Sequence, residues 1–585
     1  MTTTYEAPLH LMRLALHQAA DATGLSTLDG MADVFGELAD TVLESAARFA
    51  GEVLSPLNPA GDRSPARCTA EGVVTTPGFA DAYRRFREDG WTSLGAPEEF
   101  GGQGLPLLLS AAVTEMWGGA NLAFAMCPEV AVGAIEALRA HAPQELRETY
   151  LPRLVSGEWT ASMALTEPQA GSDLSTLRTR AEPDGTAWRL FGRKIYISWG
   201  DHDMAENIVH LVLARAPDAP AGTKGLSLFL VPKFVPAADG TLVRNDVHAV
   251  SLEHKMGIRA SPTCVLALGD AEGARGWLVG RLHEGLACMF TMMNHMRLGV
   301  GLHSTGLAER ACQLALSHAR ERLQGRDARG EQRPIIEHAD VRRMLLTMRA
   351  LTHAARCLAY TAAAAIDVAH GAPDEAVRAA AERRASLLTP VVKAWCSETA
   401  VEVASLGVQV HGGAGFIDDA EISQVYRDAR IGPIFEGTNY IQAQDLLGRK
   451  IVRDGGRELE ALITEMEAAA QALSAEEHAL ARLRDGLLDG CARLRAAATE
   501  LVSRAAKDTE LVGATAYHFL HWLGVLAGGW QWALAARRAV EDADTHSRSV
   551  VQLAAFYAAH VLPRAAVHEA IVLGGAEAIA QAELA

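Results

Sequence analysis

The chain has 585 residues, of which 49% are hydrophobic and 21% are charged. This length exceeds what a single hydrophobic core supports, so we expect about three or four domains. The formal net charge of −17 and the lack of a run rich in Lys and Arg argue against a nucleic-acid-binding protein.

The cysteines and the distribution of apolar residues indicate where the protein works. The eight cysteines are scattered, without a CxxC pair or a Cys/His cluster, which favours reduced buried thiols over disulfides or zinc ligands. Residues 1–20 lack a basic segment followed by an apolar core, so we expect no signal peptide. The nearest approach to a membrane-spanning run, residues 520–536, is interrupted by His521 and Gln531. We therefore expect a cytoplasmic protein without a membrane span.

The first 160 residues predict a helical domain. Residues 31–53 carry apolar side chains at helical spacing, and residues 79–90 form a second amphipathic segment. The glycine-rich stretch 100–106 predicts a loop, after which helices resume through residue 138. No Gly-Lys-Ser/Thr follows these glycines, so the loop is not a phosphate site of the Walker type.

From residue 161 to residue 280 the apolar pattern changes to a period of two, which predicts a β domain. Residues 178–181 and 188–191 flank a Pro-Asp-Gly turn and predict a hairpin. Gly, Pro and Asp separate four further strand-like runs, at 194–198, 208–214, 226–231 and 263–268. Because no helical pattern lies between these strands, we expect a small antiparallel barrel or sandwich.

Helical periodicity returns at residue 281 and continues to the end of the chain. Long helical patterns predict a bundle, at 282–323, 334–369, 374–411 and 417–430. Residues 453–585 predict an additional helical domain, whose aromatic side chains at helical spacing favour a core over a cofactor site (Tyr517, Phe519, Trp522, Trp530 and Trp532). The predicted fold is α+β, with helical, β, bundle and additional helical domains at 1–160, 161–280, 281–452 and 453–585.

A single carboxylate, Glu436, lies between the apolar residues 434–435 and the turn 437–439. Such flanks place it at a bend in dry surroundings, where desolvation raises the pKa of Glu and suits a general base near neutral pH. The ordinary alternative for an isolated Glu is a helix cap or an ion pair, here with Arg427 or Arg430.

Two segments of the predicted β domain carry groups suited to a polar or aromatic ligand. In residues 163–173, the hydroxyls of Thr166 and Ser172 flank a Pro/Gly loop whose backbone N–H groups suit phosphates. Residues 194–200 form a strand ending in aromatic and hydroxyl side chains, which could stack on and hydrogen-bond a flat ring. The alternative for the first segment is an ordinary connection into the β domain.

Three segments of the predicted bundle have a comparable composition. Asn294 and Arg297 are three residues apart and share a helix face. The segments 321–325 and 409–416 combine polar side chains with glycines. Each segment, taken alone, could be a solvated helix end or a C-cap.

Together with Glu436, these segments match one family in order and spacing. The sequence resembles the acyl-CoA dehydrogenases over almost its entire length, and within them the long bacterial branch that includes the 3-(methylthio)propionyl-CoA dehydrogenases. Further matching segments are 5–8, 201–203, 206–210, 253–257, 292–294, 441–443 and 445–446. The resemblance implies the acyl-CoA dehydrogenase-like fold, with the extra C-terminal helical domain of this branch.

The resemblance also implies the reaction. An FAD-dependent enzyme would convert an acyl-CoA thioester into a trans-2-enoyl-CoA, with Glu436 removing the pro-R α-proton while the β-hydrogen leaves as hydride to flavin N5. The flavin ribityl 2′-hydroxyl and the backbone N–H of Glu436 would hold the thioester oxygen as negative charge develops on it. Electrons would leave through an electron-transfer flavoprotein. Because no Gly-x-Gly-x-x-Gly follows a strand, FAD is expected at a domain and subunit junction.

The resemblance assigns ligand contacts residue by residue. In the β domain the FAD contacts would be Met163, Leu165, Thr166, Gly171 and Ser172, with Ser172 also near the coenzyme A phosphates, and Tyr196 and Ser198 against the isoalloxazine. The FAD pyrophosphate and adenosine would be held from the neighbouring subunit by Arg322, Gln324, His338, Gln409, Gly412 and Gly413. Thr438 would reach the FAD phosphates, and Asn294 and Arg297 would contact the acyl-CoA. We expect a homodimer, because the extra domain would cover the face where shorter relatives form a second interface.

Two bulky residues depart from the family pattern near the expected flavin. Trp199 stands where a small residue or Asn is usual, and Tyr440 stands where Gly, Ala or Gln is usual. They could narrow the acyl pocket, alter the exposure of the flavin to oxygen, or repack the wall. The alternative functions are an acyl-CoA oxidase, a dehydrogenase of a carrier-protein-bound thioester, and a non-catalytic acyl-CoA-binding relative. Retention of both Glu436 and the flavin motifs weighs against the last.

Overall fold

The computed structural model describes residues 4–237, 239–326, 329–473, 478–505, 508–542 and 546–583. The chain divides into two units. The helical unit comprises Met1–Arg48, Pro106–Gly119 and Arg297–Ala585, and the sheet unit comprises Phe49–Leu105 and Ala120–Met296.

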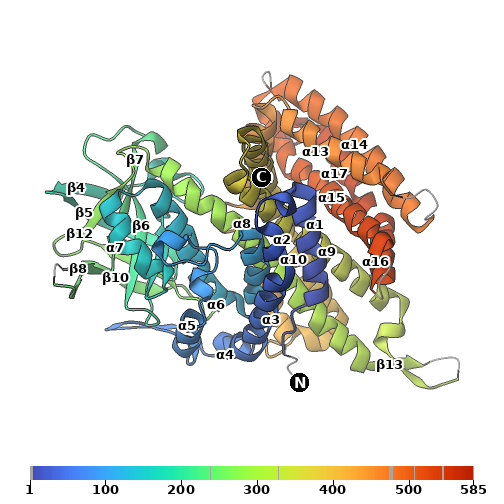
Figure 1. The fold of residues 1–585 in the computed structure, drawn as a ribbon, viewed down its shortest axis with the longest axis horizontal. Helices are drawn as coiled ribbons and strands as arrows, with labels where there is room; N and C mark the ends of the chain where they lie inside the picture. Colours follow the sequence, from blue (N-terminus) through green and yellow to red (C-terminus); the bar gives the residue numbers. More distant parts are fainter. Residues whose placement is uncertain are drawn as a thin grey trace. The chain divides into compact units, whose positions relative to one another are not determined.

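The sheet unit contains an eight-stranded sheet with the order β10-β11-β5-β12-β7-β6-β3, in which β4 also pairs with β5 and β6 (Figure 1). Its strands are β3 Trp159–Ala164, β4 Arg180–Asp184, β5 Ala187–Ser198, β6 Asn207–Arg215, β7 Leu226–Pro232, β10 Val247–Leu252, β11 Thr263–Leu268 and β12 Ala274–Val279. The pairings are antiparallel, as expected, except that β3 runs parallel to β6 and a single β4 residue pairs in parallel with β6. The predicted hairpin is β4–β5, and the predicted run 194–198 is the end of β5.

Both faces of this sheet are apolar. On β6, Leu211 and Leu213 belong to one apolar cluster, while Val212 and Ala214 belong to the other. The first cluster includes residues of α7 (Gln144–Val155) and of the second half of α6 (Leu107–His141). Strands covered on both faces read as continuous apolar runs, which gave β6 and β7 a clear signal in the sequence.

The remaining elements of the sheet unit are short. Its other helices are α4 Leu57–Arg63 and α5 Phe79–Glu88, and its small hairpins are β1–β2 (Arg67–Thr69, Gly72–Val74) and β8–β9 (Phe234–Pro236, Leu242–Arg244). Helix α5 confirms the predicted amphipathic segment at 79–90. The predicted glycine-rich loop follows a single 3₁₀ turn at Glu98–Phe100.

The bundle of the helical unit is built on three long helices, α8 Gly285–Glu321, α9 Ala339–Gly371 and α10 Glu375–His411. They confirm the predicted helices, with one correction at the ends: Leu323 and Pro334, the last and first residues of the predicted helices 282–323 and 334–369, belong to the hairpin β13–β14 (Leu323–Arg326, Gln332–Pro334). Asp374 caps α10, because its carboxylate accepts hydrogen bonds from the backbone N–H of Ala376 and Val377.

Shorter helices complete this bundle. They are α1 Leu9–Thr23, α2 Met31–Asp33, α3 Ala39–Phe49, α11 Glu421–Ala429 and α12 Asn439–Gln444. The predicted helix 31–53 is confirmed as α2 and α3 joined and extended by π turns at Val34–Leu38 and Ala50–Leu54. The first turn of α6 is held by Asp367 of α9, whose oxygens accept from the N–H groups of Leu107 and Leu108, both at 2.8 Å.

A network of buried charges lies within the helical unit. The guanidinium of Arg356 on α9 donates to Glu115 of α6 at 2.7 Å and to Glu309 of α8 at 2.8 Å. The hydroxyl of Tyr360 donates to the second oxygen of Glu115 at 2.8 Å. Arg356, Glu115 and Tyr360 are fully buried, so each polar group depends on the others for hydrogen bonds.

The C-terminal residues form a further group of helices (Figure 1). They are α13 Arg457–Gln471, α14 His478–Ala505, α15 Thr509–Asp542, α16 Ser547–His560, α17 Ala565–Gly574 and α18 Glu577–Gln581. Four of the five aromatic residues of α15 that were predicted as core are buried, namely Phe519, Trp522, Trp530 and Trp532, whereas Tyr517 is partly exposed and its hydroxyl donates to Glu398 at 3.4 Å. The indole N–H of Trp532 donates to the carbonyl of Ala350 on α9 at 3.0 Å, which attaches α15 to the bundle.

All eight cysteines are free thiols, as expected, and all are buried except Cys68.

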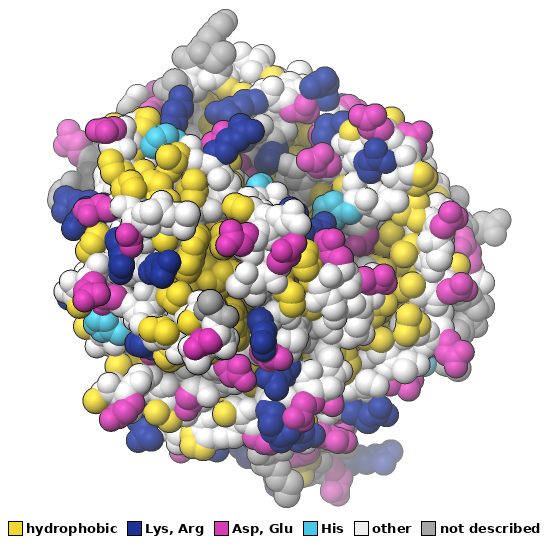
Figure 2. All heavy atoms as spheres, turned by 60° about the vertical axis from the view of Figure 1, so that its left-hand side comes forward, with side chains coloured by type: hydrophobic (Ala, Val, Ile, Leu, Met, Phe, Trp, Pro, Cys, Tyr) yellow, Lys and Arg dark blue, Asp and Glu magenta, His cyan; other side chains and the backbone are white. Residues whose placement is uncertain are grey.

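Two segments, Leu107–His141 and Ser547–Gly574, are long and apolar enough to cross a membrane by length and composition, with 89% and 44% of their most apolar windows buried. On the face drawn in Figure 2, acidic and basic side chains are interspersed.

Candidate active site

Glu436 lies on a strained turn of the helical unit, directly before α12. Its φ is +58°, and the following Gly437 has a φ of +81°. A left-handed conformation is costly for a residue other than glycine and persists where the surroundings enforce it. The turn is therefore held by its neighbours rather than by the preference of Glu436 itself.

The surroundings of the Glu436 carboxylate change its acidity. Its Oε2 atom is buried and has no hydrogen-bond partner among the residues that the structure describes. Burial raises the pKa of Glu436 to about 7, although the charges of Arg297 and Lys393 oppose this shift. Among the described residues, Oε2 of Glu436 accepts from neither of the two alternative partners, Arg427 and Arg430, and Arg427 contacts Asp418 at 3.2 Å.

Two buried cations from different helices lie near this turn. Lys393 of α10 donates from Nζ to the carbonyl of Gly437 at 2.8 Å and to Oδ1 of Asn439 at 2.9 Å. Arg297 of α8 is 6% exposed, and a Cβ atom built on Gly437 would lie 3.9 Å from its Nη2. Burial lowers the pKa of Arg297, while the nearby carboxylates of Asp445 and Glu436 raise it. The second predicted substrate residue, Asn294, is exposed on the same helix.

The residues that follow Glu436 stabilise the start of α12. The hydroxyl of Thr438 accepts from the N–H of Ile441 at 3.3 Å and so caps the helix. Gln442 donates from Nε2 to the carbonyls of Glu436 at 3.3 Å and Gly437 at 3.2 Å. The hydroxyl of Tyr440 donates to the carbonyl of Gly513 on α15 at 3.2 Å, so this bulky side chain contacts the C-terminal helices.

The predicted cofactor residues of the sheet unit gather at the ends of β3 and β5. The N–H of Ile195 donates to the carbonyl of Thr166 at 2.9 Å, which joins the two segments. Tyr196 has a φ of +60° and is 61% exposed, and Thr166 and Ser198 are partly exposed. Of the other predicted contacts, Leu165 is buried, Met163 is partly buried, and Gly171 and Ser172 are exposed on the loop.

Glu167 anchors the loop that carries these residues. Its buried carboxylate accepts from the N–H groups of Arg178 at 2.7 Å and Thr179 at 2.9 Å, and from Lys194 Nζ at 2.9 Å. Burial raises the pKa of Glu167, but the charge of Lys194 and these hydrogen bonds outweigh it and lower the pKa to about 2. The loop is therefore fixed to β5 by an ionised carboxylate.

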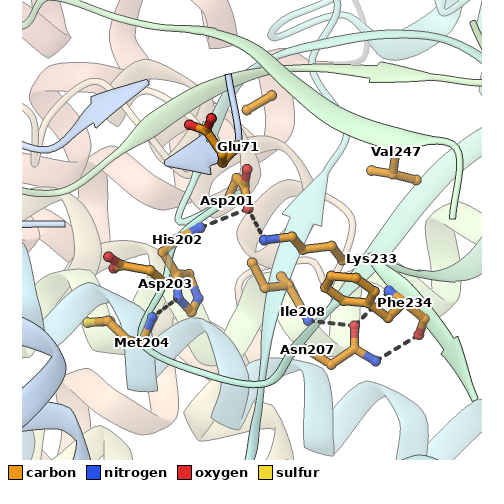
Figure 3. Close-up of polar contacts among 12 residues, drawn as sticks. Glu71, Asp201, His202, Asp203, Met204, Asn207, Ile208, Lys233, Phe234 and Val247 are labelled. Carbon is orange, nitrogen blue, oxygen red and sulfur yellow. Dashed lines mark hydrogen bonds and ion pairs between the residues drawn. The ribbon is translucent and has the colours of Figure 1, made fainter. Parts of the chain in front are cut away.

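The segment after β5 is anchored in a similar way (Figure 3). Asp201 accepts from Lys233 Nζ at 2.5 Å and from the N–H of His202 at 3.0 Å. Burial lowers the pKa of His202 to about 3, so its ring is neutral and Nδ1 accepts from the N–H of Met204 at 3.1 Å. Trp199 is fully buried, with its ring centroid 6.5 Å from that of Phe79, so its bulk repacks the core of the sheet unit.

Taken separately, the exposed groups of the sheet unit fit a flavin, and the carboxylate of the helical unit fits a thioester. Tyr196 holds an aromatic ring in solvent, with the hydroxyls of Thr166 and Ser198 on neighbouring segments, which suits stacking and hydrogen bonding to a flat polar ring. The buried and unpartnered Oε2 of Glu436 is suited to a substrate that brings its own proton.

The residues expected to serve a neighbouring subunit lie on one part of the helical unit. Arg322, Gln324, Gln409, Gly412 and Gly413 are exposed, and His338 is partly exposed. The imidazole Nε2 of His338 hydrogen-bonds the carbonyl of Gln324 at 2.8 Å. The ends of α8 and α10 are joined by the stacked rings of His318 and His411, with centroids 4.3 Å apart.

Lys393, Asn439 and Gln442, whose side chains hydrogen-bond at the turn that carries Glu436, were not predicted as site residues from the sequence. Lys393 is the single charged residue in the apolar stretch 387–396 of α10. A lone lysine on an otherwise apolar helix segment is expensive to bury, and this signal could have marked it as a site residue.

Comparisons with known proteins show which family this chain belongs to. Four family models match in succession: Acyl-CoA dehydrogenase, N-terminal domain, at 37–158; middle domain, at 162–271; C-terminal domain, at 283–451; and Acetyl-CoA dehydrogenase C-terminal like, at 462–583. The chain is 46% identical over 539 residues to the 3-methylmercaptopropionyl-CoA dehydrogenase of Ruegeria pomeroyi, covering 91% of each protein.

Two solved structures share the fold. An acyl-CoA dehydrogenase complexed with FAD from Bacillus anthracis superposes with a TM-score of 0.76 at 24% identity, covering 94% of this chain and 90% of that one. Caenorhabditis elegans ACDH-11 in complex with C11-CoA superposes with a TM-score of 0.78 at 20% identity, covering 96% of this chain and 93% of that one.

Proposed function

Because this chain belongs to the acyl-CoA dehydrogenase family and is an FAD-dependent oxidoreductase acting on a CH–CH bond, we propose that Glu436 removes the α-proton of its acyl-CoA substrate. One observation carries this proposal: Oε2 is buried and without a hydrogen-bond partner among the described residues. With a pKa of about 7, Glu436 is partly ionised at neutral pH and strong enough as a base to take up a proton there.

The backbone of the same residue supports the proton transfer. An α-C–H is a very weak acid, so the thioester oxygen must be held by donors as enolate charge develops. Among the described residues, the N–H of Glu436 donates to no acceptor, which leaves it available for that oxygen. When bound, the flavin accepts the β-hydrogen as hydride, which leaves a trans-2-enoyl-CoA.

We infer that FAD is shared between two subunits of a homodimer. Thr166, Ser172, Tyr196 and Ser198 would hold one part of the cofactor, and Thr438 would reach its phosphates. The exposed residues around Gln324, His338 and Gly412 would hold the pyrophosphate and adenosine of the partner's FAD. Light scattering of the yellow protein tests this inference, since a monomer that retains FAD fully would contradict it.

The reduced flavin must pass its electrons on, and we propose an electron-transfer flavoprotein as the acceptor, in the cytoplasm. The alternative, an oxidase, differs in one measurable property: the substrate-reduced enzyme would react rapidly with O₂.

We also propose domain bounds of 1–160, 161–280, 281–452 and 453–585, which the ends of the four matched ranges support.

The substrate can be found by anaerobic flavin bleaching across a panel of saturated acyl-CoAs. We expect a yellow protein with one FAD per chain, bleached by at least one member of the panel. The panel includes 3-(methylthio)propionyl-CoA, because the relative at 46% identity is named for that thioester. A colourless protein, or one that no acyl-CoA bleaches, would point to a non-catalytic acyl-CoA-binding protein.

Arg297→Ala is expected mainly to raise KM, with a smaller loss in kcat. Interactions made equally in the ground state and the transition state behave in this way, and Arg297 is proposed to position the acyl-CoA. Steady-state kinetics measure the split. Arg493→Ala is the matched control, since Arg493 is exposed and contacts Asp489 at 2.9 Å. A collapse of kcat at unchanged KM would show that Arg297 acts on Glu436 instead.

A further inference from the structure

We propose that Lys393 is a positioning residue for Glu436, whose ammonium group holds the turn that carries the base and supplies positive charge that keeps the base ionised. This inference rests on the proposed role of Glu436 and adds a residue from another helix to it.

Packing alone does not explain a lysine at this position. Lys393 is 0% exposed and lies in the apolar stretch 387–396 of α10, where an uncharged side chain of similar length would fill the same space. Burying an ammonium group is costly unless it is well paired. Its hydrogen-bond acceptors are an amide oxygen and a carbonyl oxygen, and it forms no ion pair with a described carboxylate.

The hydrogen bonds of Lys393 converge on the backbone that follows the base. The carbonyl of Gly437 accepts from Lys393 Nζ at 2.8 Å and from Gln442 Nε2 at 3.2 Å. Asn439, the second acceptor, donates back to Ser397 Oγ at 3.0 Å and to the carbonyl of Ala394 at 3.2 Å. The peptide after Glu436–Gly437 is thus tied to α10 on one side and to α12 on the other.

This attachment is needed because the turn is strained. A left-handed conformation is costly for a residue other than glycine and must be enforced by its surroundings. Glu436 has a φ of +58°, and its own carbonyl accepts only a longer bond, at 3.3 Å from Gln442. The shorter hydrogen bond from Lys393 to the carbonyl of Gly437 is therefore a main restraint on the direction in which the Glu436 side chain points.

The charges around the base give Lys393 a second effect. The groups acting on Glu436 are Arg297 from α8 and Lys393 from α10, and both oppose the rise of its pKa that burial causes. Burial lowers the pKa of Lys393 to about 7, while the charges of Glu436 and Glu398 raise it and that of Arg297 lowers it further. The charge of Asp445 in turn raises the pKa of Arg297, and that of Arg449 lowers it. Both residues lie between α12 and α13 in the chain. Removal of the Lys393 charge must therefore leave the pKa of Glu436 higher.

The test uses Lys393→Met in the holoenzyme and measures proton abstraction apart from flavin reduction. Acetyl-CoA has α-hydrogens and no β-carbon, so its α-hydrogen/deuterium exchange in D₂O reports the base alone. Exchange requires the ionised base, so its rate falls as pH drops below the pKa of Glu436, near 7 in the wild type. In Lys393→Met we expect the midpoint to rise by about one unit or more, with a loss of about fivefold or more at pH 7 that recovers at higher pH.

Two variants provide the controls. Lys450→Met removes a cation from the same unit that contacts Ser386 Oγ at 2.5 Å, and it should leave the midpoint unchanged. Lys393→Arg keeps the charge and should hold the midpoint near the wild-type value. Infrared difference spectra between each protein and its Glu436→Gln counterpart report the protonated carboxyl directly and should show the same shift. If Lys393→Met does not fold, Lys393→Gln, which keeps a donor and lacks the charge, serves the same test.

An unchanged midpoint in Lys393→Met or Lys393→Gln overturns the inference, even if the rate falls equally at every pH. Glu436→Gln separates this failure from a failure of the proposed function. If Glu436→Gln abolishes exchange while the lysine variants keep the wild-type midpoint, only the role of Lys393 is wrong. If Glu436→Gln exchanges at the wild-type rate, Glu436 is not the base and both proposals fail.

Discussion

The Glu436→Gln enzyme is expected to bind FAD and acyl-CoA, and to reduce its flavin about 10²–10⁴-fold more slowly than the wild type. The amide is nearly isosteric with the carboxylate and leaves the backbone N–H of residue 436 in place, so folding and ligand binding should survive. An amide cannot accept the α-proton. Stopped-flow bleaching under anaerobic conditions, with the best substrate of the acyl-CoA panel, measures the loss.

Two further variants sharpen this result. Glu436→Asp should also be slow, because shortening the side chain misplaces the carboxylate, and misplacement by about 1 Å can cost on the order of 10²-fold. Glu402→Gln makes the same chemical change at an exposed carboxylate that contacts Arg564 at 2.9 Å, and it should bleach at the wild-type rate. Wild-type bleaching by Glu436→Gln would remove Glu436 from the mechanism.

Arg356→Met is expected to destabilise the helical unit by about 3–5 kcal/mol, because it leaves an uncompensated carboxylate inside the protein. Arg356 contacts Glu115 at 2.7 Å and Glu309 at 2.8 Å, and both Arg356 and Glu115 are 0% exposed. Burial raises the pKa of Glu115, and Arg356 is the main group that opposes this rise. Without the arginine, Glu115 must take up a proton or the helices must separate.

Urea unfolding followed by circular dichroism measures this loss as a lower midpoint. Arg504→Met is the matched control, because Arg504 contacts Glu500 at 2.8 Å in an exposed pair, and such pairs contribute only about 0.3–0.5 kcal/mol. The double variant Glu115→Gln/Arg356→Met should recover part of the loss, since it removes the buried charge as well. If Arg356→Met unfolds at the same urea concentration as the Arg504→Met control, the buried network does not stabilise the fold.

Much of the fold followed from local sequence patterns. The helices α8, α9 and α10 were predicted because apolar side chains recur at helical spacing over more than thirty residues in each. The hairpin β4–β5 followed from its Pro-Asp-Gly turn, and β6 and β7 followed from their long apolar runs. These signals depend on residues that are close together in the sequence, so they can be recognised without knowledge of the residues that pack against them.

Elements whose signal is not local were missed. The six-residue strand β3 is almost entirely buried, contains small and polar residues, and pairs in parallel with β6, so neither a turn nor an alternating pattern marks it. The hairpin β13–β14 was not predicted, and the predicted helices 282–323 and 334–369 overlap it at Leu323 and Pro334, because helix ends have weak signals and a hairpin of this size is specified by its pairing. Both cases required knowledge of a pairing partner.

The candidate site shows the same division. The sequence indicated Glu436 through its apolar flanks and tight turn, and mainly through the resemblance of the surrounding segments to the acyl-CoA dehydrogenases. Whether Glu436 paired with Arg427 depended on the position of Asp418. Whether Trp199 crowded the site depended on the core of the sheet unit, and whether Tyr440 crowded it depended on the position of α15. Lys393 is 44 residues before the carbonyl it holds, and only the packing of α10 against the turn brings them together. The sequence therefore determined which group could act as a base, and the tertiary structure decided its charge and direction, because both depend on groups that are distant along the chain.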